Sequence, residues 1–435
     1  MIPFLIEYVL LLLFLSYICF LLYIKTQSPF WFHQPVHHTT MIYPRTIGYW
    51  SKPYIIKSTQ QIKPNLYSDF FHIQTYAYAD LPSDKKASLL AFIQAQYLDS
   101  EDFIYDITEP VLDIYFTGQK HQTFVSFYHK EILREHRTKA SGFSLKTSFE
   151  KDPICSMITA QQYIWFLEWN QESATNQSLF FPIYTWNYNC THRDYKSQNL
   201  SRNMIQTHLY NIYQQSSVPA SIFKKEVTLC VGITPFVQYL TYTFFIKKTP
   251  ITKLPLGYKI KRLDARTINA WVELYTQIPH MQSIFDVCLM PSLSNTMKCI
   301  EKETHYVLLL LCTLEGKENI KGVYVFKDTY TVWDKLEEIS PDAPKRTIQC
   351  VSSICYDLSQ TLYFFRGFVH CVKELYYQKK NYGVLSIEHN SHNGIILQRW
   401  NEKYSMHMST QTAYYLYNMV YPKSPIKQER FFTFN

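Results

Sequence analysis

The chain opens with one long apolar run and continues as shorter segments that alternate between apolar and polar residues. From Ile2 to Ile24 the only charged residue is Glu7, and the part from Val9 onward carries no charge. About twenty residues of helix, at about 1.5 Å each, cross the roughly 30 Å hydrocarbon layer of a membrane. Residues 2–24 are therefore predicted to form a transmembrane anchor in front of a soluble body.

A cleaved signal peptide is the alternative interpretation of this run. Signal peptides have a basic start, a shorter apolar core and a small-residue cleavage site. Here the start carries Glu7 and the run exits through Tyr23–Ser28, which favours an uncleaved anchor. The nearest basic side chains, from Lys25 to Lys57, follow the run, so a single-pass membrane protein with a cytosolic body is expected.

Behind the anchor, two sets of predicted elements follow one another in similar order, with helices and strands distinguished by the spacing of their apolar residues. The first set contains a helix over Ser83–Tyr97, two strands over Thr123–Tyr128 and Gly142–Leu145 joined by a charged turn, a strand over Leu179–Tyr188, a helix around Met204–Tyr213, and a strand over Glu226–Gly232. The second set contains a helix over Asp264–Tyr275, a hairpin of Tyr306–Leu314 and Gly322–Phe326, a strand over Ile348–Tyr356, a helix over Leu362–Tyr376, and a strand over Gly383–Ile387.

The repeated order of helix, hairpin, strand, long helix and strand predicts an α+β fold built from two copies of one unit. Lysines, prolines and a glycine between residues 247 and 257 interrupt the pattern and indicate the boundary. The expected organisation is the anchor over 2–24, a first half over 26–248 and a second half over 249–435.

Composition narrows the class of protein further. The net charge of +8 is spread without Lys/Arg blocks, so nucleic acid is not an expected partner. The 36 Tyr and 29 Phe, against 10 Gly, favour a well-packed body over disorder. The ten cysteines show no paired spacing, so neither a disulfide framework nor a zinc site is predicted. His33, His37 and His38 are close enough in sequence to suggest a metal site. Adjacent histidines in an aromatic loop are more often solvent-facing, so no metal is expected.

Three segments suggest chemistry. Directly after the anchor stands Phe30-Trp-Phe-His-Gln-Pro-Val36, an aromatic loop. In the middle, Asn187–Asn199 runs from a strand end through a polar turn to a helix N-terminus, where backbone N–H groups and the helix dipole favour an anion. Near the end, Ala413-Tyr-Tyr-Leu-Tyr-Asn418 precedes an apolar C-terminus, Phe431–Asn435.

In this order the three segments resemble the N-myristoyltransferase family, which moves a fourteen-carbon acyl chain from coenzyme A to an N-terminal glycine. The family's Phe-Trp-x-x-Gln-Pro-Val opening is matched at Phe30–Val36. Its Asn-Phe-Leu-Cys-Val-His stretch is similar to Asn187–His192, and its Tyr-Tyr-Leu-Tyr-Asn ending is matched at Tyr414–Asn418. The resemblance covers residues 30–435 and implies two tandem acetyltransferase-like halves.

The resemblance implies myristoyl-CoA as the cosubstrate, with no prosthetic group, and places Phe30, Trp31 and Gln34 at its binding site. The family's Arg-Ser-Lys-Arg phosphate loop is similar to Lys196-Ser197-Gln198-Asn199, where two of three cations are missing. Charge-assisted contacts contribute about 1.5–3 kcal/mol each, so their loss weakens the expected binding unless Arg193 or Arg202 compensates.

The catalytic roles carried by the resemblance need little from side chains. Two backbone N–H groups, those of Tyr188 and Asn189, are implied as the oxyanion hole. The C-terminal α-carboxylate, here that of Asn435, is implied as the general base that takes a proton from the glycine amine. A family threonine near that amine is placed at Cys230.

A glycine-terminated peptide is the expected partner of a monomeric body. The family's acidic peptide-binding loop is similar to Tyr97-Leu-Asp99-Ser-Glu101-Asp102, and Tyr356 is assigned to the same site. The family's Phe-Arg-Phe beyond that loop becomes Ile104–Asp106, and its Asn-Ala-Leu-Asp becomes Ser386–His389, so a divergent pocket is expected.

Simpler or different interpretations stay open at this point. The acidic residues of the loop fit a solvated turn as well as an attraction for a basic peptide. Cys190 and His192 fall on alternate strand positions and fit a covalent nucleophile, although a buried inert thiol is commoner. The depleted phosphate loop fits a second function: an inactive relative that serves as a membrane-tethered peptide- or lipid-binding protein.

Overall fold

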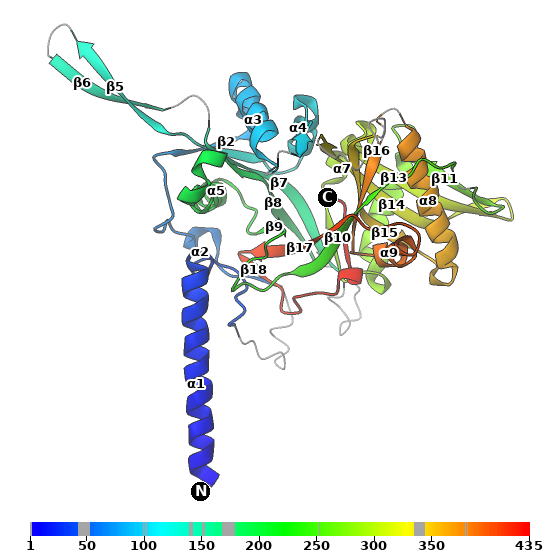
Figure 1. Cartoon of the computed structure of the whole chain (residues 1–435), viewed down its shortest axis with the longest axis horizontal. Helices are drawn as coiled ribbons and strands as arrows, with labels where there is room; N and C mark the ends of the chain where they lie inside the picture. The colour runs from blue at the N-terminus through cyan, green and yellow to red at the C-terminus, as the bar shows by residue number, and fades with distance from the viewer. Residues whose placement is uncertain are drawn as a thin grey trace.

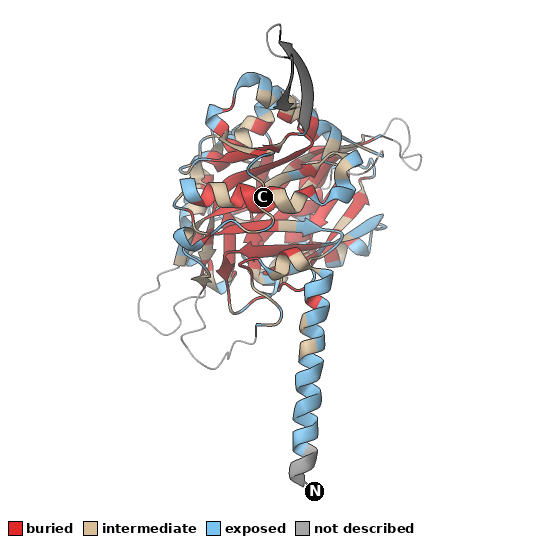
Figure 2. Cartoon of the chain, turned by 90° about the vertical axis from the view of Figure 1, so that its left-hand side faces the viewer, coloured by how far each residue is buried: buried red, intermediate tan, exposed pale blue. Residues whose placement is uncertain are grey.

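The body is organised by one sheet of 15 strands with helices on its faces (Figure 1). The computed structural model describes the chain except for residues 1, 42–52, 99, 101, 139–141, 150–152, 168–178, 252, 335–343, 379 and 381, and without the side chains of 2–5, 131–149 and 279. The strands of the sheet are mostly buried, whereas the N-terminal helix is exposed (Figure 2).

The first half is built around a long antiparallel pair, β7 (Cys155–Phe166) and β8 (Leu179–Thr191). The strands β2 (Ile73–Ala77), β4 (Phe124–Tyr128) and β9 (Ser221–Glu226) extend it. Helix α5 (Leu200–Gln215) buries Met204, Ile205 and Leu209 against the sheet. The other helices of this half are α3 (Ser83–Gln96) and α4 (Glu109–Phe116).

The second half repeats this plan. The antiparallel strands are β11 (Tyr258–Arg262), β13 (His305–Leu314), β14 (Lys317–Trp333) and β15 (Arg346–Cys355), and β16 (Tyr382–Glu388) runs parallel to β15. Helix α8 (Thr361–Tyr377) joins β15 to β16 and buries its apolar face in the core together with α9 (Asn393–Asn401). The other face is covered by α6 (Asn269–Gln277) and α7 (Leu293–Glu301).

The two halves exchange strands at the centre of the sheet. The strand β10 (Val237–Phe245) pairs with β16, and β17 (Met408–Tyr417) lies between β10 and β9. Likewise β12 (Val287–Met290) pairs with the end of β7 and carries β19 (Phe431–Thr433) on its other side. The short β3 (Phe103–Tyr105) pairs with β14. Each half therefore supplies hydrogen-bonding partners to the other.

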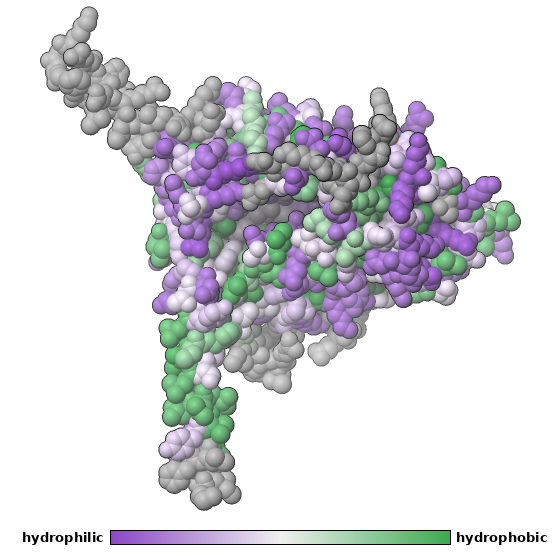
Figure 3. Space-filling view, viewed as in Figure 1, coloured by the Kyte–Doolittle hydropathy of each residue, from purple (hydrophilic) through white to green (hydrophobic). Residues whose placement is uncertain are grey.

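The N-terminal helix α1 (Ile2–Gln27) projects from the body as an exposed apolar rod (Figure 3). The most apolar stretch of α1 has a mean hydropathy of 2.2, and 6% of it is buried. Among the described residues, α1 is thus a helix long and apolar enough to cross a membrane. It touches the body near its end, where Ile24 packs on Gly232, and leads into the short α2 (Pro29–Phe32).

Most predicted elements are confirmed, but one strand is wrong. The strand expected over Glu226–Gly232 ends at Glu226, because Val227 and Gly232 have φ values of +67° and +83°, outside the strand region. The polar segment expected as a turn after Tyr128 contains the strand β5 (Glu131–Thr138), which pairs with β6 (Gly142–Phe149) in a separate two-stranded sheet. The short β1 (Tyr54–Ile55) and β18 (Met419–Val420) form another such pair.

Candidate active site

A β-bulge interrupts β8 at the motif expected to hold an oxyanion. The register with β7 shifts there by one residue, so that Tyr188 and Asn189 together oppose Met157 alone. Tyr188 has a φ of 49°, in the left-handed region that non-glycine residues rarely adopt. Because a bulge takes residues out of the regular ladder and re-aims them, the backbone N–H groups of Tyr188 and Asn189 can serve a ligand.

The segment expected to bind phosphate lies at the N-terminus of α5. The chain leaves β8 through a short 3-10 helix, Arg193–Gln198, and Asn199 adopts a φ of 55° before α5 begins. The side chains of Lys196, Ser197, Gln198 and Asn199 are all exposed. The N-terminus of a 16-residue helix is a favourable place for an anion, although of these four side chains only that of Lys196 is cationic.

The N-terminal aromatic motif packs against the C-terminal tyrosine motif. The Tyr417 hydroxyl donates a hydrogen bond of 2.8 Å to Oε1 of Gln34, across 383 positions in the sequence. Phe30 and Gln34 are each 3% exposed, and the Trp31 ring lies nearly parallel to that of Phe223, with 5.2 Å between centroids. Residues that the sequence assigns to ligand binding therefore also fasten the first segment of the body to the last.

The last residue, Asn435, lies within the body and is half-buried (Figure 1). Its backbone oxygen accepts hydrogen bonds from the hydroxyls of Tyr414, at 2.9 Å, and Thr433, at 3.0 Å. Its side-chain oxygen lies 2.9 Å from Nε2 of His305, and burial holds the pKa of that imidazole well below its usual value. The end of the described chain is therefore held among polar partners inside the body.

The last turn of α4 contacts both the bulge and the surroundings of the chain end. The Phe116 ring is 6.1 Å from that of Tyr188, and the ring of the preceding residue, Tyr115, is 6.0 Å from His305. Since His305 contacts Asn435, the two elements to which the sequence assigns catalytic roles both lie close to the last turn of α4.

A charged cluster that the sequence analysis missed lies beside this region. The Lys224 ammonium on β9 is 2.6 Å from the Glu388 carboxylate on β16 and 2.8 Å from that of Glu226. Glu388 is 1% exposed and accepts a further hydrogen bond of 2.6 Å from the Tyr239 hydroxyl. The Lys224 ammonium holds the pKa of Glu226 below its usual value. In the sequence, the signal that could have indicated this cluster is the presence of charged residues in otherwise apolar strands.

Lys327 is a second lysine in this region. It faces His305 across the β13–β14 ladder, and its ammonium lies 5.3 Å from the centre of the Tyr115 ring. Burial, with the nearby Lys224 charge, lowers the pKa of Lys327 to about 8. Near neutral pH a fraction of this amine is therefore uncharged, close to the chain end.

The expected peptide-binding loop is described in part. Asp99 and Glu101 lie outside the described residues. Tyr97 is 44% exposed and its ring lies 4.9 Å from that of Tyr188, beside the bulge. Asp102 is exposed and accepts a hydrogen bond of 3.0 Å from Ser100, so its contacts are those of a solvated turn.

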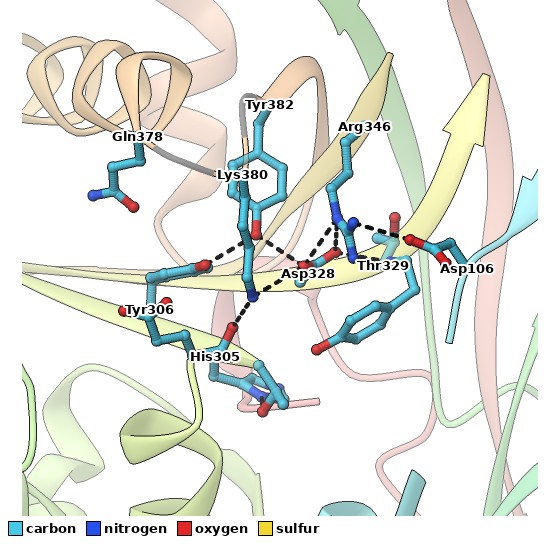
Figure 4. Close-up of polar contacts among 12 residues, drawn as sticks. Asp106, His305, Tyr306, Asp328, Thr329, Arg346, Gln378, Lys380 and Tyr382 are labelled. Atoms are coloured by element: carbon cyan, nitrogen blue, oxygen red, sulfur yellow. Dashed lines mark hydrogen bonds and ion pairs between the residues drawn. The ribbon is translucent and has the colours of Figure 1, made fainter. Parts of the chain in front are cut away.

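Behind this loop, a polar network around the buried Asp328 fastens β3 to the second half (Figure 4). Asp106, directly after β3, lies 3.2 Å from the Arg346 guanidinium. Arg346 in turn lies 3.2 Å from Asp328, a carboxylate that is fully buried. Asp328 also accepts a hydrogen bond of 2.9 Å from the Tyr382 hydroxyl and lies 3.5 Å from the Lys380 ammonium. The network fixes where the loop stands relative to the second half.

Two other predicted site residues lie elsewhere. The Cys230 amide donates a hydrogen bond of 3.1 Å to the Tyr415 hydroxyl, and the residue packs in the cluster that holds Trp31. Burial raises the pKa of the Cys230 thiol to about 11. Tyr356 follows β15, bonded through its amide to the Lys321 carbonyl at 3.1 Å, and no contact of the described residues joins it to Tyr188 or Asn435.

The covalent alternative finds no support in the geometry. Cys190 is 5% exposed, and burial raises the pKa of its thiol, which disfavours the nucleophilic thiolate. His192 turns to the helix instead: its Nδ1 accepts a hydrogen bond of 3.3 Å from the Asp194 amide. Among the described contacts, none joins the thiol to the imidazole.

The fold of the chain is similar to that of solved N-myristoyltransferases. Baker's yeast (Saccharomyces cerevisiae) N-myristoyltransferase with bound myristoyl-CoA matches with a TM-score of 0.61 and 11% identity, over 92% of this chain and 94% of the yeast chain. The yeast enzyme with bound myristoyl-CoA and inhibitors matches with a TM-score of 0.63 and 11% identity, over 92% and 91% of the two chains. No family model and no curated protein matches the sequence. The likeness confirms the predicted α+β fold of two acetyltransferase-like halves.

Proposed function

We propose that this chain is a membrane-anchored acyltransferase of the N-myristoyltransferase family, which transfers an acyl group from acyl-CoA to the N-terminal glycine of a protein. The observation that carries the proposal is that Tyr188 in the β8 bulge and His305, which contacts Asn435, both lie against the last turn of α4. One element offers N–H groups to a developing oxyanion, and the other offers a carboxylate to an amine.

In the proposed reaction the neutral glycine amine attacks the thioester carbonyl, and the C–S bond breaks as the amide C–N bond forms. The N–H groups of Tyr188 and Asn189 stabilise the negative charge on the carbonyl oxygen. The α-carboxylate of Asn435 takes the proton that the amine loses, and the thiolate of coenzyme A leaves. An N-terminal amine has a pKa of about 8, so near neutral pH most of it is protonated, and the neutral form that attacks is the minor one. The carboxylate next to it must also hold the amine in place for attack.

Acyl-CoA is the proposed cosubstrate because the yeast neighbours bind myristoyl-CoA. In this proposal its phosphates lie at Lys196–Asn199 and the N-terminus of α5. Phe30, Trp31 and Gln34 then line the acyl side, while Tyr97 and Asp102, with Asp99 and Glu101, face the acceptor peptide.

A specific observation favours a second candidate function. Of the four side chains in the loop before α5, only that of Lys196 is cationic, and each missing charge-assisted contact weakens binding of coenzyme A. An inactive relative that holds a peptide or lipid at the membrane fits this depletion.

Transfer assays separate the two candidates. The full chain in detergent micelles is incubated with acyl-CoA donors and glycine-terminated peptides, and the products are measured by mass spectrometry. The proposal predicts transfer, and it predicts more than a hundredfold loss when three residues are added after Asn435, because the carboxylate moves away from the amine. A chain lengthened by three residues at the exposed Glu315–Gly316 turn is the control. No transfer and no acyl-CoA binding would leave the inactive relative.

Membrane attachment and its orientation belong to the same proposal. Helix α1 would cross the bilayer with Lys25 on the cytosolic side. The sequons at Asn189 and Asn199 are exposed, so they report the orientation. The full chain made in human cells is expected to show no change in mobility after glycosidase treatment, whereas the body behind a cleavable signal peptide is expected to shift. Glycosylation of the full chain would place the body in the lumen instead.

A further inference from the structure

The strands β8 and β9 diverge close to the bulge. They pair in parallel at only two positions, Tyr184 with Ser221 and Thr185 with Ile222. Beyond these pairs β8 continues to Thr191 along β7, while β9 continues along β17. The split between the two strands opens toward the loop before α5, and the bulge at Tyr188 lies on its edge.

Aromatic rings close the narrow end of this split. The first residues beyond the last ladder pair are Trp186 and Phe223, whose rings are parallel within 8° and 4.4 Å apart. Trp31 lies against both, at 5.2 Å from Phe223 and 6.4 Å from Trp186. Trp186 and Phe223 are 9% and 6% exposed. A regular pair of parallel strands would continue its hydrogen bonds beyond this point. Here the strands β8 and β9 do not, and three aromatic rings with nearly parallel planes lie beside them.

Polar atoms without partners lie around the same rings. The indole N–H of Trp186 and the amide nitrogen of Gln34 are buried, and neither has a hydrogen-bond partner among the described residues. Gln34 is held next to the rings by Tyr417, whose own ring is 5.4 Å from Trp186. A hydrocarbon chain laid here would satisfy neither of these groups, whereas water or a polar group would.

We propose that Trp31, Trp186 and Phe223 form a stop that limits the donor to short-chain acyl-CoA, with an acyl group of up to about six carbons. The inference rests on the proposed function, in which the phosphates lie at the open end of the split and the thioester carbonyl lies at Tyr188 and Asn189. The acyl chain then points toward the closed end. Two residues of strand separate the bulge from Trp186, or about 7 Å, and a fourteen-carbon chain needs more than twice that length.

The test compares donors of increasing chain length. The full chain in detergent micelles is titrated calorimetrically with acetyl-, hexanoyl-, decanoyl- and myristoyl-CoA. Hexanoyl-CoA is expected to bind at least tenfold more tightly than myristoyl-CoA. In Trp186→Leu, which shortens the stop, binding of myristoyl-CoA is expected to improve at least tenfold while that of hexanoyl-CoA stays within about threefold.

Two further variants separate a stop from a general packing effect. Trp271→Leu removes a buried tryptophan from the core of the second half, whose indole N–H also has no partner among the described residues, and it should leave the preference for chain length unchanged. Phe223→Leu removes the facing ring and should shift the preference as Trp186→Leu does, also if Trp186→Leu fails to fold.

The outcomes distinguish the stop from the proposed function. If the unaltered chain binds myristoyl-CoA as tightly as hexanoyl-CoA, the stop is wrong and the acyltransferase proposal stands. If no acyl-CoA of any length binds, both are wrong. A preference for short donors that neither Trp186→Leu nor Phe223→Leu alters would also overturn the stop.

Discussion

Glu388 lies in the interior, and several neighbours donate hydrogen bonds to its carboxylate. Besides Lys224 and Tyr239, it accepts hydrogen bonds from Gln349, at 3.0 Å, and Asn390, at 3.1 Å. Lys224 belongs to β9 and Glu388 to β16, so the pair also joins the two halves. A buried carboxylate with this many donors stabilises the fold only while every partner is present.

Glu388→Ala is expected to lower the free energy of unfolding by about 3–5 kcal/mol, because it leaves the buried donors without an acceptor. Urea denaturation followed by circular dichroism measures the change. Glu318→Ala is the matched control, since Glu318 forms an exposed pair with Lys259, and its stability should stay unchanged. Equal effects of the two variants would contradict the role assigned to Glu388.

The lowered pKa of Lys327 predicts how the stability of the fold depends on pH. Its pKa falls from an ordinary 10.5 to about 8 in the folded chain. Between these values the unfolded chain binds more protons, so stability rises with pH, and the penalty for the charged amine is complete below pH 8. Lys327→Met should therefore raise stability at pH 7 by about 2–3 kcal/mol. The gain should shrink as the pH rises through 10, as thermal unfolding at several pH values would measure. In Lys259→Met, at an exposed position, no such trend is expected.

Sequence patterns singled out some candidate site residues and not others, for physical reasons. Tyr188, Asn189 and Asn435 were predicted because a motif or a chain end marks them, and they stay predictions. Lys224 and Lys327 were not singled out, and Glu388 was named only as part of Ser386–His389, because the charges of all three are explained by partners on distant strands. A local pattern contains no information on which strands will be neighbours.

At the scale of elements, β5 and β6 stand apart from the rest. They pair with each other over eight positions, in a two-stranded sheet of their own, and project from the body (Figure 1). A two-stranded hairpin contributes little stability by itself. The strand β6 was predicted, whereas the residues of β5 were predicted as a charged turn, because the sequence Glu131–Thr138 lacks a regular alternation of apolar and polar residues.

Replacing Glu131–Phe149 by a short Gly-Ser linker is expected to leave the midpoint of thermal unfolding within a few degrees of that of the unaltered chain. Differential scanning calorimetry measures it. Removing β19 (Phe431–Thr433), which pairs with β12 in the interior, is the contrasting deletion and should lower the midpoint strongly. A large loss from the hairpin deletion would show that it packs on the body.

Elements with a strong periodic signal were predicted well, such as α5, α8 and the β13–β14 hairpin. Strands such as β7 and β10 were missed, since both lie inside the sheet, where polar residues are tolerated between buried neighbours. The strand β9 was displaced toward its C-terminus, because the apolar Val227–Gly232 segment looks more like a strand than Lys224–Glu226 does. Tertiary pairing overrode local propensity in each case.

For the whole molecule, the repeated order of elements predicted two related halves, but it could not predict their exchange of strands. The strand β17, from the second half of the chain, fills the place between β9 and β10 of the first half. The expected boundary near residue 248 divides the sequence, while the hydrogen-bonded sheet continues across it. The halves resemble each other without being independent.

Residues 26–248 made alone are therefore expected not to fold cooperatively, because β9 and β10 lack β17, and β10 also lacks β16. Co-expression with residues 249–435 should restore a folded, co-purifying pair. Amide hydrogen exchange of the fragment and of the pair measures the difference. A cooperative unfolding transition in the isolated first fragment would contradict this reading of the sheet.

The position of β17 has a consequence for biosynthesis. The ribosome delivers β9 and β10 more than 160 residues before β17, as their positions at Ser221–Phe245 and Met408–Tyr417 show. Until then the facing edges of β9 and β10 are open, and open edges recruit other strands. Insertion of α1 into a bilayer would hold each nascent chain apart from its neighbours during this interval. The helix that we propose as a membrane anchor would then also limit aggregation during translation.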